Sequence, residues 1–298
     1  MAGPEPSGPA RIAAMSRDPT VCWLDDALLP WADARLPVED RGLQFGESVY
    51  EVLPVTAGRA RLLEAHTARL ASGAAALGIE GPDAGRVADV VRRLIAAEGV
   101  AEGLAYLQLT GGTAPRAHVP DEPPRPTLIA YLRAHRFPRA ADVTHGVRAV
   151  TVPDERWARC DLKTTMLLPT VFAKRIAHQR GADEAILIAD DGTVREGAST
   201  SVIAVLDGAL VVPEPSTRRL PGTMSALVET VAIEAGLVLS HRALAIVDLP
   251  GADEVLVTAT SKLVLPVVAV DDVEIGGGTV GPVAIDLAAR VRRRLELE

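Results

Sequence analysis

The sequence predicts an α+β protein that folds into two lobes, and three observations lead to this prediction. Its short apolar runs outnumber its helical stretches, and the two kinds do not alternate as they do in a Rossmann sheet or a TIM barrel. The chain of 298 residues, 48% hydrophobic and 23% charged, is long enough for one large or two modest domains. A polar segment with a proline, residues 136–142, is the expected linker between the lobes.

The first and smaller lobe is expected at 20–138, behind a flexible tail at 1–19 that lacks the apolar centre of a signal peptide. The strands of its hairpin flank an Ala-Gly pair, its helices carry apolar residues at helical spacing, and its last two strands flank a proline-rich loop. The expected elements are a β-hairpin (49–55 and 59–63), two helices (64–76 and 83–98) and two strands (104–111 and 126–133).

The second and larger lobe is expected at 139–298. One of its helices ends before Gly181, which is suited to a C-cap. The expected strands are 146–153, 184–189, 200–206, 209–212, 254–259 and 266–270, and the expected helices are 168–180, 223–235 and 281–296.

Charge and composition exclude several classes of function. The net charge is −8 and there is no basic stripe, so nucleic acid is not an expected partner. No run approaches the roughly 18 apolar residues of a membrane span. Cys22 and Cys160 are too few for a disulfide framework or a zinc site, and the histidines lack ligand-like spacing, so no metal is expected. These features favour a cytoplasmic protein.

Any chemistry that needs a lysine amine must use one of three residues. Lys174 lies in a helical run and Lys262 follows a strand, so both are expected to be solvated surface charges. Lys163 lies between a strand and a helix, among apolar and small polar residues, where a partly desolvated amine could form an imine. Its local sequence leaves a surface role open as well.

Three further segments carry groups that could bind a cofactor or substrate. Leu220–Ser225 opens an expected helix, whose first amides favour phosphate, although the Pro-Gly pair could be a simple turn. Glu196 stands beside a glycine and hydroxyls, either as a loop acid or as a carboxylate facing a cofactor ring nitrogen. Arg116 and His118 are two residues apart in an expected extended stretch, so their side chains could bind one carboxylate together or simply lie on a surface loop.

Six short segments that occur in a fixed order identify a protein family more specifically than any one of them alone. They read EDRGLQFGESVYE (39–51), EAHTARL (64–70), GTAPRAH (112–118), RWARCDLK (156–163), EGAST (196–200) and VTATS (257–261). Together they resemble the fold-type IV family of pyridoxal-phosphate aminotransferases, and most closely its bacterial D-amino acid aminotransferases. The resemblance runs from about residue 21 to 297 and implies that the second lobe binds pyridoxal 5'-phosphate between the lobes.

The resemblance implies roles for residues at the cofactor. Lys163 matches the lysine that holds the cofactor aldehyde as a Schiff base and moves the proton. Glu196 matches the carboxylate paired with the pyridine nitrogen. The other matches are Arg69, Ser199 and Thr260 near the phosphate, Leu220 under the ring, and the phosphate loop Gly222, Thr223 and Met224.

Two departures from the family pattern lie near the expected phosphate. The loop reads Gly-Thr-Met-Ser where the relatives have Gly-Ile-Thr-Arg. Met224 cannot supply the hydroxyl expected there, although Thr223 could, and Ala198 replaces a serine. A third departure, Glu47-Ser48 in place of Asp-Gly, adjoins the expected substrate site. The first two predict weaker cofactor binding than in the relatives.

The family's binding site for the substrate α-carboxylate is matched by Tyr50, Arg116 and His118. In the family the arginine and histidine reach in from the other subunit, so the resemblance implies a homodimer. The implied reaction moves the amino group of a D-amino acid to a 2-oxo acid such as 2-oxoglutarate, with ping-pong kinetics. Alternatives on the same fold are an (R)-amine transaminase, a branched-chain L-aminotransferase and aminodeoxychorismate lyase; a non-catalytic cofactor- or metabolite-binding protein is the alternative from another class.

Overall fold

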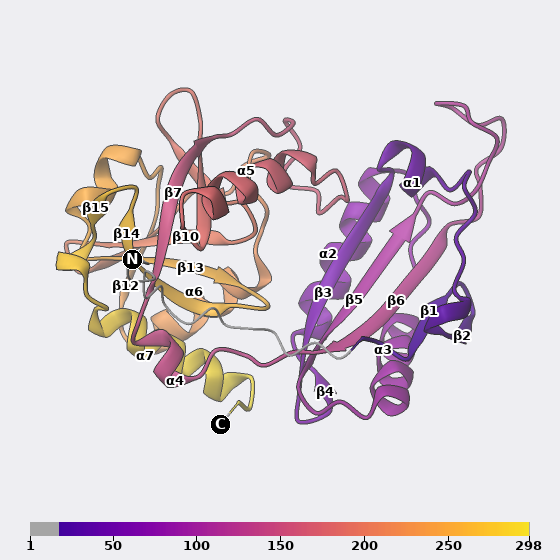
Figure 1. The fold of residues 1–298 in the computed structure, drawn as a ribbon, viewed down its shortest axis with the longest axis horizontal. Helices are drawn as coiled ribbons and strands as arrows, with labels where there is room; N and C mark the ends of the chain where they lie inside the picture. The colour runs from indigo at the N-terminus through magenta and orange to yellow at the C-terminus, as the bar shows by residue number, and fades with distance from the viewer. Residues whose placement is uncertain (1–17, 298) are drawn as a thin grey trace, which may run out of the picture.

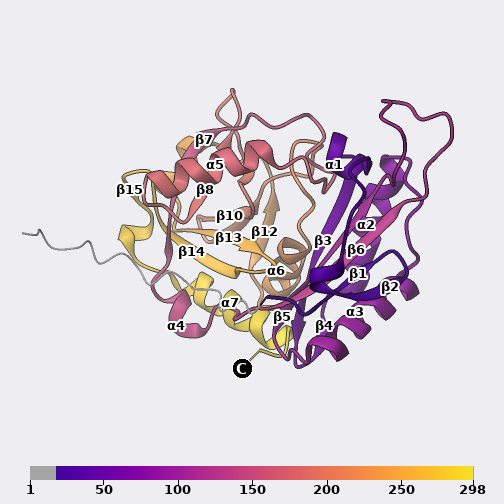
Figure 2. The same ribbon diagram turned by 45° about the vertical axis from the view of Figure 1, so that its right-hand side comes forward.

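The computed structural model describes residues 18–297, and its strands form two separate sheets. Six strands from the first half of the chain form the smaller sheet and nine from the second half form the larger, which occupy different sides of the molecule in Figures 1 and 2. Helices and strands are mixed without regular alternation, which confirms the predicted α+β class. Among the described residues, no helix has both the length and the apolar character needed to cross a membrane.

The smaller sheet is antiparallel throughout, and helices cover one of its faces. In spatial order its strands are β2 (Ala27–Pro30), β1 (Val21–Leu24), β6 (Thr127–Ala134), β5 (Gly103–Thr110), β3 (Ser48–Thr56) and β4 (Arg59–Ala60). The covering helices are α2 (Leu63–Ala76) and α3 (Ala84–Glu98). Since side chains alternate between the faces of a strand, Ala105 and Leu107 of β5 are buried under the helices. Tyr106 and Gln108 lie half-buried on the other face.

The larger sheet is mixed, with three parallel pairs. In spatial order its strands are β12 (Val238–His241), β11 (Ala209–Val212), β10 (Ser201–Leu206), β13 (Glu254–Ala259), β14 (Leu263–Val270), β7 (Val147–Pro153), β8 (Glu184–Ile188) and β9 (Val194–Gly197), and β15 (Val273–Glu274) pairs with β14. The helices packed on it are α5 (Leu168–Gln179), on β7 and β8, and α6 (Thr223–Glu234) and α7 (Pro282–Arg294), which share one apolar core. The remaining short elements are α1 (Arg41–Phe45), α4 (Ala140–Val143) and the 3-10 helices η1 (Trp31–Asp33), η2 (Ile246–Gly251) and η3 (Gly276–Gly278).

The connection between the sheets is more ordered than its composition predicts. Residues 136–142 were expected to be a linker, but Phe137 is 1% exposed and belongs to the core shared by α6 and α7. Arg136 and Asp142 form an ion pair at 2.9 Å, and the segment ends in α4. The connection is therefore fixed to the second sheet, because one aromatic residue anchors an otherwise polar stretch. The predicted boundary at 138/139 falls within it.

The expected tail at 1–19 lies outside the described residues except for its last two. Asp18 pairs with Arg133 at 2.8 Å, and Pro19 is buried. Pro19 is therefore packed in the fold, and Asp18 is linked to the smaller sheet by an exposed ion pair, contrary to the prediction that both belong to a flexible tail.

Several element boundaries also differ from the predictions. The second hairpin strand was expected to reach residue 63, but it ends at Ala60, because Leu62 takes a left-handed conformation (φ 53°) at the start of α2. The sequence did not indicate the short strands β1, β2, β12 and β15 or the helix α1 as separate elements.

Candidate active site

A cavity of about 450 Å³ lies between the two sheets and is lined by both. Every predicted site residue except Arg116 and His118 lines it. They are Tyr50 of β3 and Arg69 of α2 on the smaller side, and Lys163, Glu196, Ser199, Leu220, Gly222, Thr223, Met224 and Thr260 on the larger side. The fold thus brings together residues that are up to 210 positions apart in the chain (50 and 260).

Lys163 lies on the connection between β7 and α5, and the smaller sheet fixes its backbone. Its carbonyl accepts the N–H of Tyr50 at 3.0 Å, and Thr164 forms an isolated bridge with Val49. The Lys163 Nζ lies 4.2 Å from the centroid of the Tyr50 ring. The amine is therefore held at the wall of the cavity by an element of the opposite sheet.

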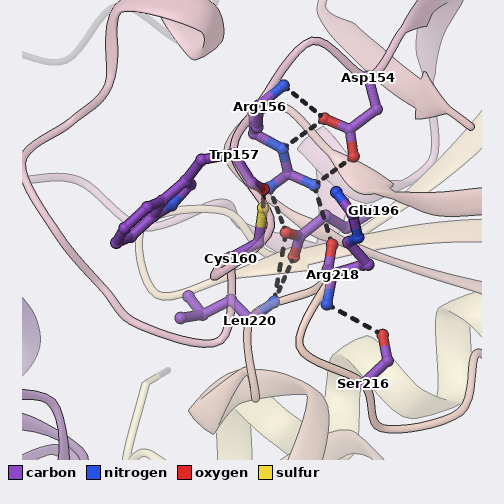
Figure 3. Close-up of polar contacts among 8 residues, drawn as sticks. All are labelled: Asp154, Arg156, Trp157, Cys160, Glu196, Ser216, Arg218 and Leu220. Atoms are coloured by element: carbon purple, nitrogen blue, oxygen red, sulfur yellow. Dashed lines mark hydrogen bonds and ion pairs between the residues drawn. The ribbon is translucent and has the colours of Figure 1, made fainter. Parts of the chain in front are cut away.

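Glu196, on β9, lies in a buried polar cluster in which Arg156 stands between two carboxylates (Figure 3). The Nη1 of Arg156 donates to Glu196 Oε1 at 2.5 Å, and its other nitrogens bond both oxygens of Asp154 at 2.8 and 3.0 Å. The N–H of Leu220 donates to the Glu196 carboxylate at 3.2 Å. Burial raises the pKa of Glu196, and the adjacent guanidinium opposes this rise. The carboxylate is thus oriented from two sides and borders the cavity.

The start of α6 and the hydroxyls beside it fit a phosphorylated ligand. Gly222 precedes α6 without a side-chain cap, so among the described residues no capping side chain takes up the amides of the first turn. A Cβ at Gly222 would come within 2.6 Å of the Ser201 Oγ, so the loop is closed to larger residues. The hydroxyls of Thr200 and Thr258 are buried at the cavity and find no partner among the described residues. An unpaired buried polar group costs about 1–3 kcal/mol, a cost that phosphate oxygens at this site would remove.

Arg69 reaches from α2 to the phosphate loop. Its Nε and Nη2 donate to the Glu51 carboxylate at 2.7 and 2.8 Å. Its Nη1 donates to the carbonyl of Pro221 at 2.7 Å. A fixed positive charge thus stands beside the first turn of α6, where a phosphate would need it. With the Lys163 amine and the Glu196 carboxylate, the cavity contains groups suited to the aldehyde, ring nitrogen and phosphate of pyridoxal phosphate.

The side chain of Met224 lies in the hydrophobic core, although its position in the loop suggested that it would face the phosphate. Its side chain is 2% exposed and packs in the core shared by α6 and α7. Only its backbone amide can face a ligand, so the side chain does not stand where the relatives' hydroxyl was expected. Ala198 is also buried, against the core beside α5. The side chain at position 224 therefore packs in the core and does not take the place of the expected hydroxyl.

The predictions for the two other lysines are wrong. Lys174 and Lys262 are not solvated charges, because both bond the carboxylate of Glu184, at 2.6 and 3.0 Å. Glu184, on β8, is fully buried; burial would raise its pKa, but the two ammonium groups hold it below its usual range. Burial also disfavours the charged form of Lys174 and so lowers its pKa, and the negative charge of Glu184 opposes that shift. The Ser199 hydroxyl lies 3.4 Å from the same carboxylate, so this cluster supports the cavity wall.

Arg116 and His118 lie on the exposed loop between β5 and β6, outside the cavity of their own chain. The Arg116 guanidinium is 4.8 Å from the centroid of the Phe45 ring, and the His118 ring is 5.6 Å from it. Both side chains therefore lie beside the same ring, but bends at 115–116 and 118–119 interrupt the extended stretch on which the spacing argument depended. A buried arginine, Arg41, holds this loop by donating to the carbonyls of residues 117 and 118 at 2.7 and 3.0 Å, a role that no local pattern indicated.

The Glu47-Ser48 pair, one of the departures from the family pattern, has a structural role. Glu47 forms an ion pair with Arg41 at 2.5 Å and so helps to fix the arginine that holds the loop. The Ser48 hydroxyl bonds Thr165 at 2.5 Å, close to Lys163 in sequence. Both residues connect the smaller sheet to parts of the predicted site.

Sequence reasoning missed several charged residues of the site. Arg156, Glu51, His66 and Glu184 were not assigned roles, although the first three stand in the motifs that carried the resemblance. One signal was available for Glu51, because it alternates with Val49 and Leu53 and therefore lies on the buried face of β3. A charged residue on a buried face needs partners.

Comparisons with known proteins agree with this geometry. The family model described as amino-transferase class IV matches residues 48–270. A D-alanine aminotransferase of Staphylococcus haemolyticus is 32% identical over 279 residues, covering 93% of this chain and 98% of that protein. One of Bacillus licheniformis is 35% identical, covering 86% and 90%. Among solved structures, a T.th. branched-chain amino acid aminotransferase complexed with N-(5'-phosphopyridoxyl)-L-glutamate is 25% identical, with a TM-score of 0.85 over 94% of this chain and 96% of that one.

Proposed function

Because this chain belongs to the class IV aminotransferase family, and is therefore a pyridoxal-phosphate-dependent aminotransferase, we propose that its amino donor is a D-amino acid. The acceptor is a 2-oxo acid, as in the conversion of D-alanine and 2-oxoglutarate to pyruvate and D-glutamate. The pairing of Arg116 with His118 on one loop carries this proposal, since an arginine fork and an imidazole suit an α-carboxylate. The D-alanine aminotransferases that match most of the chain support it.

The residues of the cavity divide the work of holding the cofactor. Lys163 would hold the aldehyde carbon, Glu196 the ring nitrogen, and Leu220 one face of the ring. The phosphate would take the first amides of α6, Arg69 and the hydroxyls that line that end, from Ser199, Thr200, Thr258 and Thr260. When bound, pyridoxal phosphate supplies an electron sink for the charge that develops at the substrate Cα.

Two residues handle protons. The Lys163 amine is free of any ion pair among the described residues and stands at the cavity wall, where it can take the proton from the substrate Cα. The Glu196 carboxylate keeps the ring nitrogen protonated, and Arg156 orients that carboxylate. Because the oxo-acid product of the donor would leave the site before the acceptor binds there, with the amino group retained by the enzyme, ping-pong kinetics are expected.

We propose that a second copy of the chain supplies Arg116 and His118 to the cavity. Both residues lie outside the cavity of their own chain, on a loop whose shape Arg41 fixes. Large apolar side chains are exposed near the cavity and along the first turns of α5, and a contiguous exposed apolar patch is typical of an interface. They are Trp157, Met166, Leu167, Leu168, Val171 and Phe172.

The cellular location of the protein, which the sequence predicts to be cytoplasmic, also stays a prediction.

The substrate is tested by following the cofactor absorbance of the holoenzyme with single donors. D-alanine is expected to convert it much faster than L-alanine or (R)-1-phenylethylamine. The solved branched-chain aminotransferases of similar fold make L-leucine the necessary comparison. Faster conversion by L-leucine than by any D-amino acid would contradict the proposal.

The shared site is tested with D-alanine by mixing the inactive variant Lys163→Ala with the strongly impaired variant Arg116→Ala. If Arg116 acts across the interface, each hybrid dimer contains one intact site, formed by the lysine of one copy and the arginine of the other. Activity should then return on mixing. If Arg116 serves its own chain, every site of the hybrid lacks one residue and no activity returns.

A further inference from the structure

One buried histidine, which the proposed function does not use, connects the two sheets at the phosphate end of the cavity. His66 lies on α2 and is fully buried. Its Nδ1 is 2.6 Å from a carboxylate oxygen of Glu51, and its Nε2 is 3.3 Å from the hydroxyl of Thr223. Thr223 is the first residue of α6, whose amides face the phosphate site.

The charge of Glu51 decides which ring nitrogen of His66 carries the proton. Burial would raise the pKa of Glu51, but hydrogen bonds from Arg69 and His66 hold it below its usual range. An ionised carboxylate only accepts hydrogen bonds. The Nδ1 of His66 must therefore be protonated and donate to Glu51.

The charge of His66 then decides the direction of its second bond. Burial lowers the pKa of His66, and the positive charges of Arg69 and Lys163 add to this, while Glu51 opposes it. Among the described residues, the polar groups that act on the ring are these and the Thr223 hydroxyl, which come from β3, α2, the loop before α5, and α6. A neutral imidazole with its proton on Nδ1 has a bare lone pair on Nε2. The hydroxyl of Thr223 must therefore donate to it.

We infer that His66 is a positioning residue for the cofactor phosphate: its Nε2 accepts the hydrogen bond of the Thr223 hydroxyl, so that Thr223 offers the phosphate its backbone N–H and not its hydroxyl. The hydroxyl therefore does not replace the one missing at position 224, as the sequence suggested it could. Glu51 is the anchor of the arrangement, because it fixes His66 and also Arg69, whose Nη1 bonds the carbonyl of Pro221. Two bonds from α2 thus fasten the phosphate loop of the larger sheet to the smaller sheet.

The inference depends on the cofactor and not on the proposed D-amino acid substrate. It is tested with pyridoxamine 5'-phosphate, which binds without a covalent link to Lys163, so its affinity depends strongly on the phosphate contacts. The variants are Thr223→Val, which keeps the shape and removes the hydroxyl, and His66→Asn, whose amide can still donate to Glu51 but lacks the distal acceptor. Thr223→Ser, which keeps the hydroxyl, is the matched control.

The two variants form a double-mutant cycle. In the parent, Thr223→Val should weaken binding by about 3- to 10-fold, the usual worth of one hydrogen bond, and Thr223→Ser by much less. In the His66→Asn background, the same Thr223→Val change should have almost no effect, because its partner is already gone. An equal loss in both backgrounds would show that the hydroxyl donates to the phosphate directly, and would overturn the inference.

A second measurement needs no variant that disturbs the buried ring. In holoenzyme labelled with ¹⁵N-histidine, two-bond ¹H–¹⁵N correlations distinguish the two neutral tautomers and the imidazolium. His66 is identified as the signal that moves most in Thr223→Val. We expect the neutral Nδ1–H form at pH 7.5. An Nε2–H tautomer or an imidazolium would contradict the proposed direction of the bond, whether or not His66→Asn folds.

Discussion

Replacing Arg156 by methionine would leave Glu196 buried without the guanidinium that now bonds it. The side chains of Arg156 and Glu196 are 13% and 6% exposed, so water cannot take over the role of the lost partner. Burial already raises the pKa of Glu196, and without Arg156 nothing of equal strength opposes that rise. The carboxyl should therefore take up a proton at pH values where the parent is ionised, and a neutral carboxyl cannot keep the ring nitrogen protonated.

The size of the effect follows from the burial of the pair. Removing one partner of a buried ion pair typically costs about 3–5 kcal/mol. Part of that cost will appear as lost stability, because Asp154 loses its partner too. If about 2 kcal/mol reaches the step in which the Cα proton is removed, that step slows by about 30-fold.

The assay is the single-turnover rate of the holoenzyme with its best amino donor, measured between pH 6 and 9. Since a carboxyl with a raised pKa is neutral at low pH and ionised at high pH, the deficit of Arg156→Met should shrink as the pH rises. Arg159→Met is the matched control, because Arg159 lies on the same loop but pairs with the more exposed Asp161. A deficit that is independent of pH, or equal in both variants, would refute the reasoning.

Four further predictions follow from the site and its surroundings. Lys163→Ala should abolish transamination without unfolding the protein, and borohydride reduction of the parent followed by peptide mapping should place the cofactor on Lys163; labelling of another lysine would contradict this. Met224→Thr should not tighten cofactor binding in a fluorescence titration, and it should lower the free energy of unfolding by about 1–4 kcal/mol, because it opens a cavity and places a hydroxyl in the core. Glu184→Gln should cost about 3–5 kcal/mol in urea unfolding at pH 7, whereas Glu234→Gln, in an exposed pair, should change little. Because the pKa of Glu184 is lowered in the folded state, its contribution is present at neutral pH and is lost as the pH falls through that lowered pKa, so the two variants should converge in acid. Arg116→Ala should cost about 2–5 kcal/mol in kcat/KM for D-alanine, as for a broken buried charge pair, and little for (R)-1-phenylethylamine, which has no carboxylate; an equal loss for both substrates would make the residue structural.

The longer elements could be predicted because each carries its own pattern. The helix α3 shows apolar residues at helical spacing behind Asp83, whose side chain caps it by accepting the N–H of Arg86. The short strands could not be predicted in the same way. The strand β2, for example, has four residues that are mostly exposed, and it forms only by pairing with β1 at the edge of the sheet. Two to four residues carry too little alternation to be recognised without their partners.

The motifs located the cavity but not the contacts that support it. Arg156 and Glu196 are 40 residues apart, and Lys262 and Glu184 are 78 apart. Ion pairs between residues so distant in sequence depend on which strands are neighbours, and that order could not be read from local patterns. The sequence therefore suggested which residues could meet the cofactor and missed those that hold them in place.

The three lysines show how tertiary contacts can narrow a choice that local sequence leaves open. By local pattern, each of them could be a surface charge; the surroundings of Lys163 made an imine possible, and the family motif favoured it. In the fold, Lys174 and Lys262 both turn to one buried carboxylate and neither borders the cavity. To react, either amine would first have to break its ion pair with Glu184 and leave that buried carboxylate without one of its partners. Breaking a buried ion pair costs several kcal/mol. Lys163 has no such partner among the described residues and stands against the Tyr50 ring at the cavity wall. The pairing of the two other amines with the buried Glu184 therefore favours the same lysine as the motif does, and for an independent physical reason.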